Sequence, residues 1–203
     1  HIIHKLVEYY YTFELLKRDF DTLKELEVEH LSAYSLIIEE DTKFFLNEKE
    51  LQKSKKSLKI DDEDLSYEIF NYLKSIGFNQ YEIANFSTNK KFESKHNYGY
   101  WSKDDYIGVG AGAVACIENK RMYKQKNIEK YIQNPKYEDI EELSIDDIKA
   151  EKVLLGFRCK FGVDLNILSS KELKKVDDLV VENRVCIKEN RVYNNNFLLA
   201  DEI

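Results

Sequence analysis

The sequence has 203 residues, of which 43% are hydrophobic, so it is long enough and apolar enough to form a buried core. Its formal net charge of −7 excludes a globally positive surface of the kind that attracts nucleic acid or anionic lipid. Three widely spaced cysteines fit neither a disulfide framework nor a zinc site. No apolar run approaches the ~18 residues that a membrane-spanning helix needs, and no signal-peptide pattern is recognisable. We expect a soluble, cytoplasmic protein, for which membrane association is possible only through a partner.

Hydrophobic periodicity predicts alternating helices and strands in the first half of the chain. Thr12 is suited to capping a helix whose apolar residues recur at helical spacing, from Phe13 to Leu26. The short apolar run 30–38 predicts a buried strand. A second helix follows the acidic residues 61–64, which suit a helix N-terminus better than a metal site, and ends at Gly77. With further strands predicted at 79–86 and 106–117, this order favours an α/β layer of mostly parallel strands covered by helices.

A change in pattern around Pro135 predicts a domain boundary, with one domain at 1–126 and another at 127–203. Ser144 begins a predicted helix, and Ser169 or Ser170 begins another that runs to about Glu182. Residues 184–193 alternate around a Glu-Asn turn and predict a hairpin. Two helices and a hairpin resemble a winged-helix module, but the acidic chain argues against nucleic acid as its partner.

The most informative stretch is HNYGYW at 96–101, which its composition places in a loop between two strands. The imidazole of His96 can ligate iron, and the aromatic rings can cover the apolar face of a macrocycle. On composition alone, the simpler interpretation is a loop histidine with structural aromatics that close the end of a sheet. Just beyond it, Gly108, Gly110 and Gly112 alternate along the predicted strand 106–117, where they leave room for a ligand or a packed helix. A glycine series along a strand does not indicate a dinucleotide-binding turn.

Four motifs occur in one order along the chain: LSAYSLIIE at 31–39, QYEIANF at 80–86, HNxxYW at 96–101 and YIGVGAGA at 106–113. This order resembles HemW-type proteins, the haem-chaperone branch of the radical S-adenosylmethionine (SAM) coproporphyrinogen oxidase family. The likeness runs from about residue 13 to residue 203. It implies the C-terminal part of a partial (β/α) radical-SAM barrel, followed by a small, mainly helical, winged-helix-like C-terminal domain.

The resemblance implies a haem-binding chaperone. His96 would be the haem-associated residue and the iron ligand, with Tyr100 and Trp101 beside the porphyrin. Haem or a porphyrin is then the partner, while the protein that accepts the haem is unknown. The alternative within the family is an oxygen-independent coproporphyrinogen III oxidase, an oxidoreductase that decarboxylates its substrate in porphyrin biosynthesis.

The resemblance also implies SAM and a 4Fe-4S cluster in full-length family members. By register, Ile37 and Val114 fall at SAM contacts, and Gly110 and Gly112 leave room for that ligand. The family usually has His-Ser where Val114 and Ala115 stand here, so polar contacts from those side chains are lost. The cluster needs three closely spaced cysteines, and the cysteines of this chain are too far apart to form it. We expect no radical chemistry from this chain alone, and enzyme activity is left open.

Overall fold

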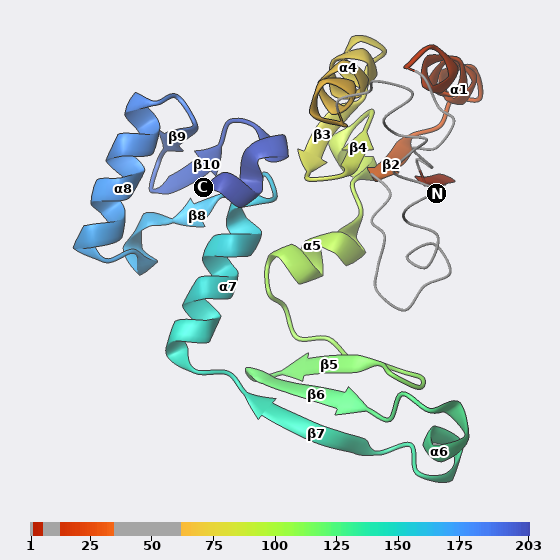
Figure 1. Cartoon of the computed structure of the whole chain (residues 1–203), viewed down its shortest axis with the longest axis vertical. Coiled ribbons are helices and arrows are strands. Elements are labelled where there is room, and N and C mark those ends of the chain that lie inside the picture. The colour runs from red at the N-terminus through yellow and green to blue at the C-terminus, as the bar shows by residue number, and fades with distance from the viewer. Residues whose placement is uncertain (1, 6–12, 35–61) are drawn as a thin grey trace, which may run out of the picture. The chain divides into compact units, whose positions relative to one another are not determined.

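The structure is a computed structural model that describes residues 2–5, 13–34 and 62–203 (Figure 1). The chain forms two compact units, His1–Glu93 and Ser94–Ile203, and each has a hydrophobic core of its own. The domain boundary predicted at 126/127 lies inside the second unit and stays a prediction. None of the described helices is long and apolar enough to cross a membrane.

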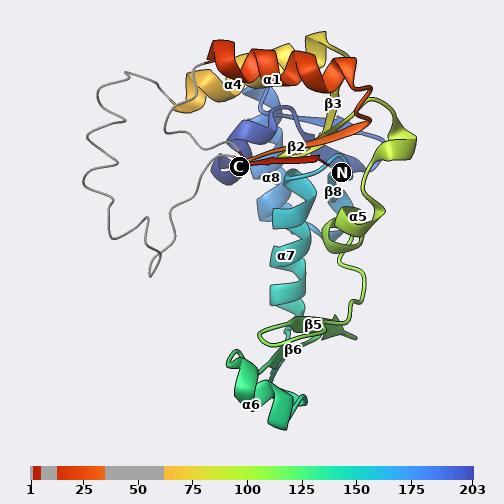
Figure 2. The same ribbon diagram turned by 90° about the vertical axis from the view of Figure 1, so that its right-hand side faces the viewer.

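In the first unit, two helices pack over a four-stranded sheet (Figure 2). The helices are α1 (Phe13–Glu25) and α4 (Asp62–Ser75). The strands are β1 (Ile2–Lys5), β2 (His30–Tyr34), β3 (Asn79–Glu82) and β4 (Asn85–Ser87), in the order β1-β2-β4-β3. A short 3₁₀ helix, Lys90–Phe92, follows the sheet.

Both predicted helices of this unit are confirmed. Apolar residues at helical spacing put one stripe of each helix into the core, where their side chains meet those of the central strands. Gly77 has φ +99°, the left-handed conformation that ends helices after their last turn. The core consists of Leu16, Phe20, Leu23, Leu31, Ala33, Ile69, Leu73, Phe78 and Phe86.

Two predictions for the sheet are corrected. The strand predicted at 79–86 is a hairpin, in which β3 and β4 run antiparallel and reverse at Ile83 and Ala84. The turn escaped prediction because it contains neither Gly nor Pro nor Asn. The sheet is also mixed, since β1–β2 is the parallel pair among the described strands and β2–β4 is antiparallel. The end of the strand predicted at 30–38, including Ile37, lies outside the described residues.

The second unit begins with the short helix α5 (Lys95–Trp101) and an antiparallel sheet. The sheet consists of β5 (Val114–Ile117), β6 (Lys120–Lys124) and β7 (Tyr137–Glu142), with α6 (Ile128–Gln133) in the connection between β6 and β7. The sequence does not predict β6 and β7, because none of their residues is buried and they lack the apolar alternation of a half-buried strand.

The rest of this unit confirms the helices and hairpin predicted for the chain end. It contains α7 (Ile145–Phe157), α8 (Ser170–Val181), and a sheet of β8 (Val163–Asp164), β9 (Val185–Lys188) and β10 (Arg191–Asn194) in the order β8-β10-β9. Two 3₁₀ helices, Leu165–Ile167 and Phe197–Glu202, complete it. Ser144 with Asp147, and Ser169 with Glu172, form capping boxes at the helix starts. The core is Phe157, Val163, Val176, Val185 and Val192.

The prediction of a glycine-rich strand at 106–117 is wrong for most of that range. The strand β5 covers its last four residues, and Tyr106 contributes one isolated bridge to Cys116. Between them the chain turns, with φ +111° at Gly110 and φ +71° at Gly112. These left-handed values are incompatible with an extended strand, so two of the alternating glycines mark turns.

Candidate functional site

The HNYGYW segment is a helix, not the loop that its composition suggests. The helix α5 begins after Ser94, whose hydroxyl oxygen accepts a hydrogen bond from the backbone N–H of Asn97 at 3.3 Å. That hydroxyl also donates to the side-chain oxygen of Asn97 at 3.1 Å. Serine is a favoured N-cap residue, but Gly99 in the middle of the segment lowers its helix propensity and obscures the signal.

The helical conformation places His96 and Tyr100 on one exposed face, because they are four residues apart. Their rings meet edge to face with centroids 4.9 Å apart. Tyr100 in turn contacts Tyr106, at 5.0 Å between centroids. The imidazole therefore lies at the surface against the Tyr100 ring, where an external ligand can reach it.

Tyr98 and Trp101 occupy another face of α5. The ring of Tyr98 packs against Phe161 with centroids 4.8 Å apart, and the ammonium of Lys160 lies 5.2 Å from the Tyr98 centroid. Trp101 lines a cavity of about 570 Å³, and His96 is not among the residues that line it. The structure thus brings His96 and Tyr100 together and places Trp101 apart from them.

The glycine-rich turn has a structural requirement at one position and open space at another. A Cβ at Gly108 would overlap the backbone of Val114, so this residue allows two chain segments to approach closely. Gly110 has no atom within 4 Å of a Cβ built on it, and its N–H donates to the Tyr131 hydroxyl at 3.3 Å. A Cβ at Gly112 would make ordinary contacts with Lys126. Val114 is half-buried at the start of β5.

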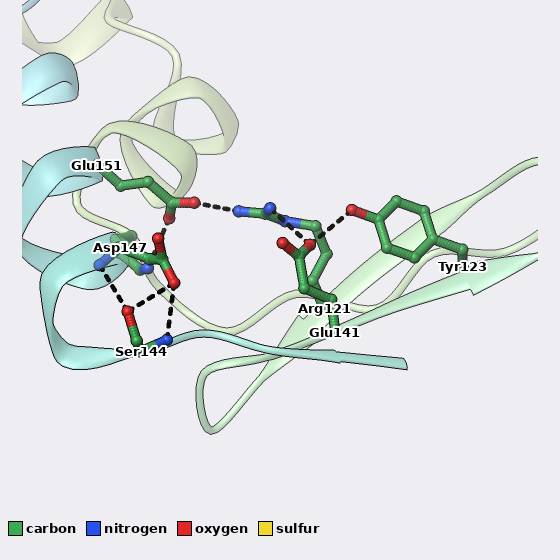
Figure 3. Close-up of polar contacts among 7 residues, drawn as sticks. Arg121, Tyr123, Glu141, Ser144, Asp147 and Glu151 are labelled. Atoms are coloured by element: carbon green, nitrogen blue, oxygen red, sulfur yellow. Dashed lines mark hydrogen bonds and ion pairs between the residues drawn. The ribbon is translucent and has the colours of Figure 1, made fainter. Parts of the chain in front are cut away.

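An ion-pair network connects the segment after α5 with β6 and α7, and Figure 3 shows its members Arg121, Glu141 and Glu151. The carboxylate of Glu151 binds Lys103 at 2.6 Å and also binds Arg121, which reaches Glu141 at 3.0 Å. Tyr123 donates to the same Glu141 carboxylate at 2.9 Å. Burial raises the pKa of Glu151, but hydrogen bonds from Lys103 and Arg121 outweigh burial and hold that pKa below its usual value. The sequence could not reveal this network, because its members are far apart along the chain.

In the first unit, the QYEIANF motif supplies buried polar residues that connect the hairpin to β2. Tyr81 shares a 2.7 Å hydrogen bond with the Nε2 of His30, and burial lowers the pKa of that imidazole. Ser32 donates to Asn85, and Asn85 donates to Glu82. All five residues are buried. Mutual hydrogen bonds of this kind offset the cost of burying polar groups, so the motif has a structural role in this unit.

The chain has relatives over most of its length, although no family model matches it. It is 33% identical over 209 residues to the "Heme chaperone HemW" of Bacillus subtilis, which covers 95% of this chain and 54% of that protein. The protein of the same name from Lactococcus lactis is 33% identical over 159 residues, covering 75% of this chain and 40% of the relative. The chain belongs to the HemW family. It spans about half the length of the HemW proteins it matches, or less.

The fold agrees with the HemW assignment. Coproporphyrinogen III oxidase from Escherichia coli, described as a radical SAM enzyme, superposes with a TM-score of 0.64 over 94% of this HemW chain and 50% of that enzyme. The sequence identity is 15%, so this likeness concerns the fold alone. It confirms the α/β class and the part of a radical-SAM fold that the motif order predicts.

Proposed function

We propose that this HemW chain carries the haem-binding surface of a haem chaperone, and that α5 is the centre of that surface. The observation that supports it is the exposed imidazole of His96, which packs against the ring of Tyr100, and Tyr100 in turn packs against Tyr106. Neutral imidazole is a common axial ligand of haem iron, and aromatic rings cover porphyrin faces favourably. The HemW relatives are themselves named haem chaperones. An exposed ligand also suits a chaperone, because an acceptor protein can reach the bound haem.

The cofactors of the radical SAM family fit this chain unequally. Haem fits the exposed His96, and it would supply an iron atom for the imidazole to coordinate. A 4Fe-4S cluster is proposed only for full-length family members, because the three cysteines of this sequence are too far apart along the chain to match the closely spaced cluster motif. SAM contact at Ile37, Gly110, Gly112 and Val114 stays a proposal. The coproporphyrinogen oxidase alternative is not favoured, because the relatives with the greater sequence identity are named haem chaperones. We also propose a cytoplasmic location.

A haemin titration tests the proposed function. Added haemin should give a shifted Soret band with the unaltered chain, and His96→Ala should weaken binding by at least tenfold because the axial ligand is lost. Lys95→Ala, a change at the neighbouring exposed residue of the same helix, is the matched control and should bind as the unaltered chain does. Identical spectra and affinities for His96→Ala and the unaltered chain would remove α5 from the haem site.

A further inference from the structure

The chain leaves α5 through a lysine in a conformation that usually belongs to glycine. Lys103 has φ +61°, the left-handed region in which glycine is the favoured residue after the last turn of a helix. Its backbone N–H donates to the carbonyl oxygen of Tyr100 at 3.0 Å, and the N–H of Asp104 donates to that of Gly99 at 2.8 Å. A non-glycine residue keeps such a conformation only where its surroundings hold it there.

The side chain of Lys103 provides that hold. It is 9% exposed, and its ammonium binds one carboxylate oxygen of Glu151 on α7 at 2.6 Å. A nearly buried ammonium has given up most of its hydration, so its charge depends on the paired carboxylate. The ion pair of Lys103 with Glu151 therefore fixes the C-terminal end of α5 to α7.

The other carboxylate oxygen of Glu151 binds Arg121 of β6 (Figure 3). Arg121 lies opposite Cys116 of β5, and Cys116 is bridged to Tyr106 by two backbone hydrogen bonds of 2.8 Å and 3.0 Å. Residues directly opposite one another in antiparallel pairs share a face of the sheet. Arg121 and Tyr106 therefore lie on the same face. Burial raises the pKa of Tyr106, and the positive charge of Arg121 opposes that rise.

Glu151 thus holds the segment 103–106 near both of its ends. The segment begins just after Tyr100, whose ring meets that of His96 with centroids 4.9 Å apart. It ends at Tyr106, whose ring lies 5.0 Å from that of Tyr100. Two aromatic contacts therefore connect the imidazole to the segment that the carboxylate holds.

We propose that Glu151 is a positioning residue of the haem surface, whose two ion pairs hold the segment 103–106 so that Tyr106 and Tyr100 support the imidazole of His96. This inference rests on the proposed function and deepens it, because it assigns control of that surface to a carboxylate on α7 that does not itself touch haem. Without the ion pairs, the end of α5 adopts further orientations. The apparent affinity then falls in proportion to the fraction of molecules that remain competent to bind.

Glu151→Gln tests the proposal, because an amide offers one acceptor oxygen and turns hydrogen atoms toward the second cation. Haemin affinity, measured by Soret titration, should fall roughly threefold to tenfold, which corresponds to a competent fraction of about a tenth to a third. Glu172→Gln is the matched control, since it also removes a carboxylate that pairs with a lysine, Lys149 at 2.5 Å, but outside the segment 103–106. Equal haemin affinities for the two variants would overturn the inference.

Lys103→Gly separates positioning from stability. Glycine adopts the left-handed conformation without strain, so the end of α5 should still form, whereas the ion pair with Glu151 is lost. This variant should lower the urea midpoint less than Glu151→Gln does, because Glu151 keeps its second partner, Arg121. Its haemin affinity should nevertheless fall at least roughly threefold. Unchanged haemin affinity in Lys103→Gly would reduce the network to a structural role and contradict the proposal.

A double substitution distinguishes failure of this inference from failure of the proposed function. In the His96→Ala background, Glu151→Gln should have no further effect on haemin affinity, because the group that it positions is gone. Additive effects of the two substitutions would show that Glu151 acts independently of His96, and would overturn the inference.

A readout without haem covers the case in which His96→Ala leaves haemin binding unchanged and the proposed haem site fails. The edge-to-face contact with Tyr100 should shift the imidazole proton resonances of His96 by ring current. That shift should shrink in Glu151→Gln and persist in Glu172→Gln. The same shift in both variants would overturn the positioning role, whatever the fate of the haem site.

Discussion

The sequence identifies individual candidate residues but does not predict how their side chains are arranged. The sequence singles out His96, Tyr100 and Trp101, but their division between two faces depends on the Ser94 cap, which turns a predicted loop into a helix. The other residues that line the cavity beside Trp101 carry no sequence signal, because only the tertiary fold brings α7, the turn before β8 and β10 together.

At the residue scale, Glu151→Gln should lower the free energy of unfolding by about 1–2 kcal/mol. Lys103, whose side chain is 9% exposed, and Arg121 would lose the carboxylate between them. The comparison is Glu142→Gln, which removes the partner of Lys120 in a pair that is 54% and 74% exposed and should cost at most about 0.5 kcal/mol. Urea unfolding measures both changes, and equal costs would show that the Glu151 network contributes nothing beyond a surface pair.

At the element scale, the elements that have local sequence signals are predicted correctly, and those that depend on tertiary contacts are not. The helices α7 and α8 are predictable because Ser144 and Ser169 form capping boxes with acidic residues three positions later. The conformation of the glycine-rich segment is not predictable in this way. Its alternating glycines suggest a strand, whereas Gly110 and Gly112 adopt left-handed φ angles. Glycine identity alone cannot distinguish an open strand from a turn or a close backbone contact.

Two glycine substitutions should therefore have opposite effects on stability. Gly99→Ala in α5 should stabilise the chain by about 0.5–1 kcal/mol, because its Cβ meets only an Asp104 oxygen at 3.8 Å and alanine favours helix. Gly108→Ala should destabilise it by about 1–3 kcal/mol, because its Cβ would overlap the Val114 backbone. Thermal unfolding of both variants provides the comparison, and a stable Gly108→Ala protein would contradict the close approach at that turn.

The start of α8 should also confer a dependence of stability on pH. Hydrogen bonds from Lys149 and Ser169 lower the pKa of Glu172 from 4.5 to about 2 in the folded chain. Because the folded pKa is the lower one, this stabilisation is complete above pH 4.5 and is lost as the pH falls toward 2. Glu172→Gln should flatten the decline of the urea midpoint across this interval. An unchanged slope would indicate that the interaction makes no contribution to folding.

At the scale of the whole molecule, the described residues have two hydrophobic cores rather than one. Apolar periodicity predicts most of the members of both cores, because helical stripes and short apolar strands leave a clear pattern. The division after Glu93 is less visible, since no Gly- or Pro-rich linker marks it. Periodicity and the family likeness both predict the α/β class. Neither predicts that the first sheet is mixed or that β5, β6 and β7 form a second, antiparallel sheet.

Two cores predict a local response to a core substitution. Leu73→Ala, at a fully buried position of the first core, should cost about 2–5 kcal/mol and accelerate amide hydrogen exchange in α1 and α4. Protection in α8 and β10, which pack around Val192, should be retained. A matched loss of protection in β10 would show that the two cores unfold as one.

The claim that α5 is the centre of the haem surface is tested most directly by the paramagnetism of haemin. Haemin added to the isotope-labelled chain should broaden the amide resonances of residues 95–101 first, and should shift the imidazole signals of His96. Broadening centred on α1 and α4, with sharp and unshifted α5 resonances, would contradict the account.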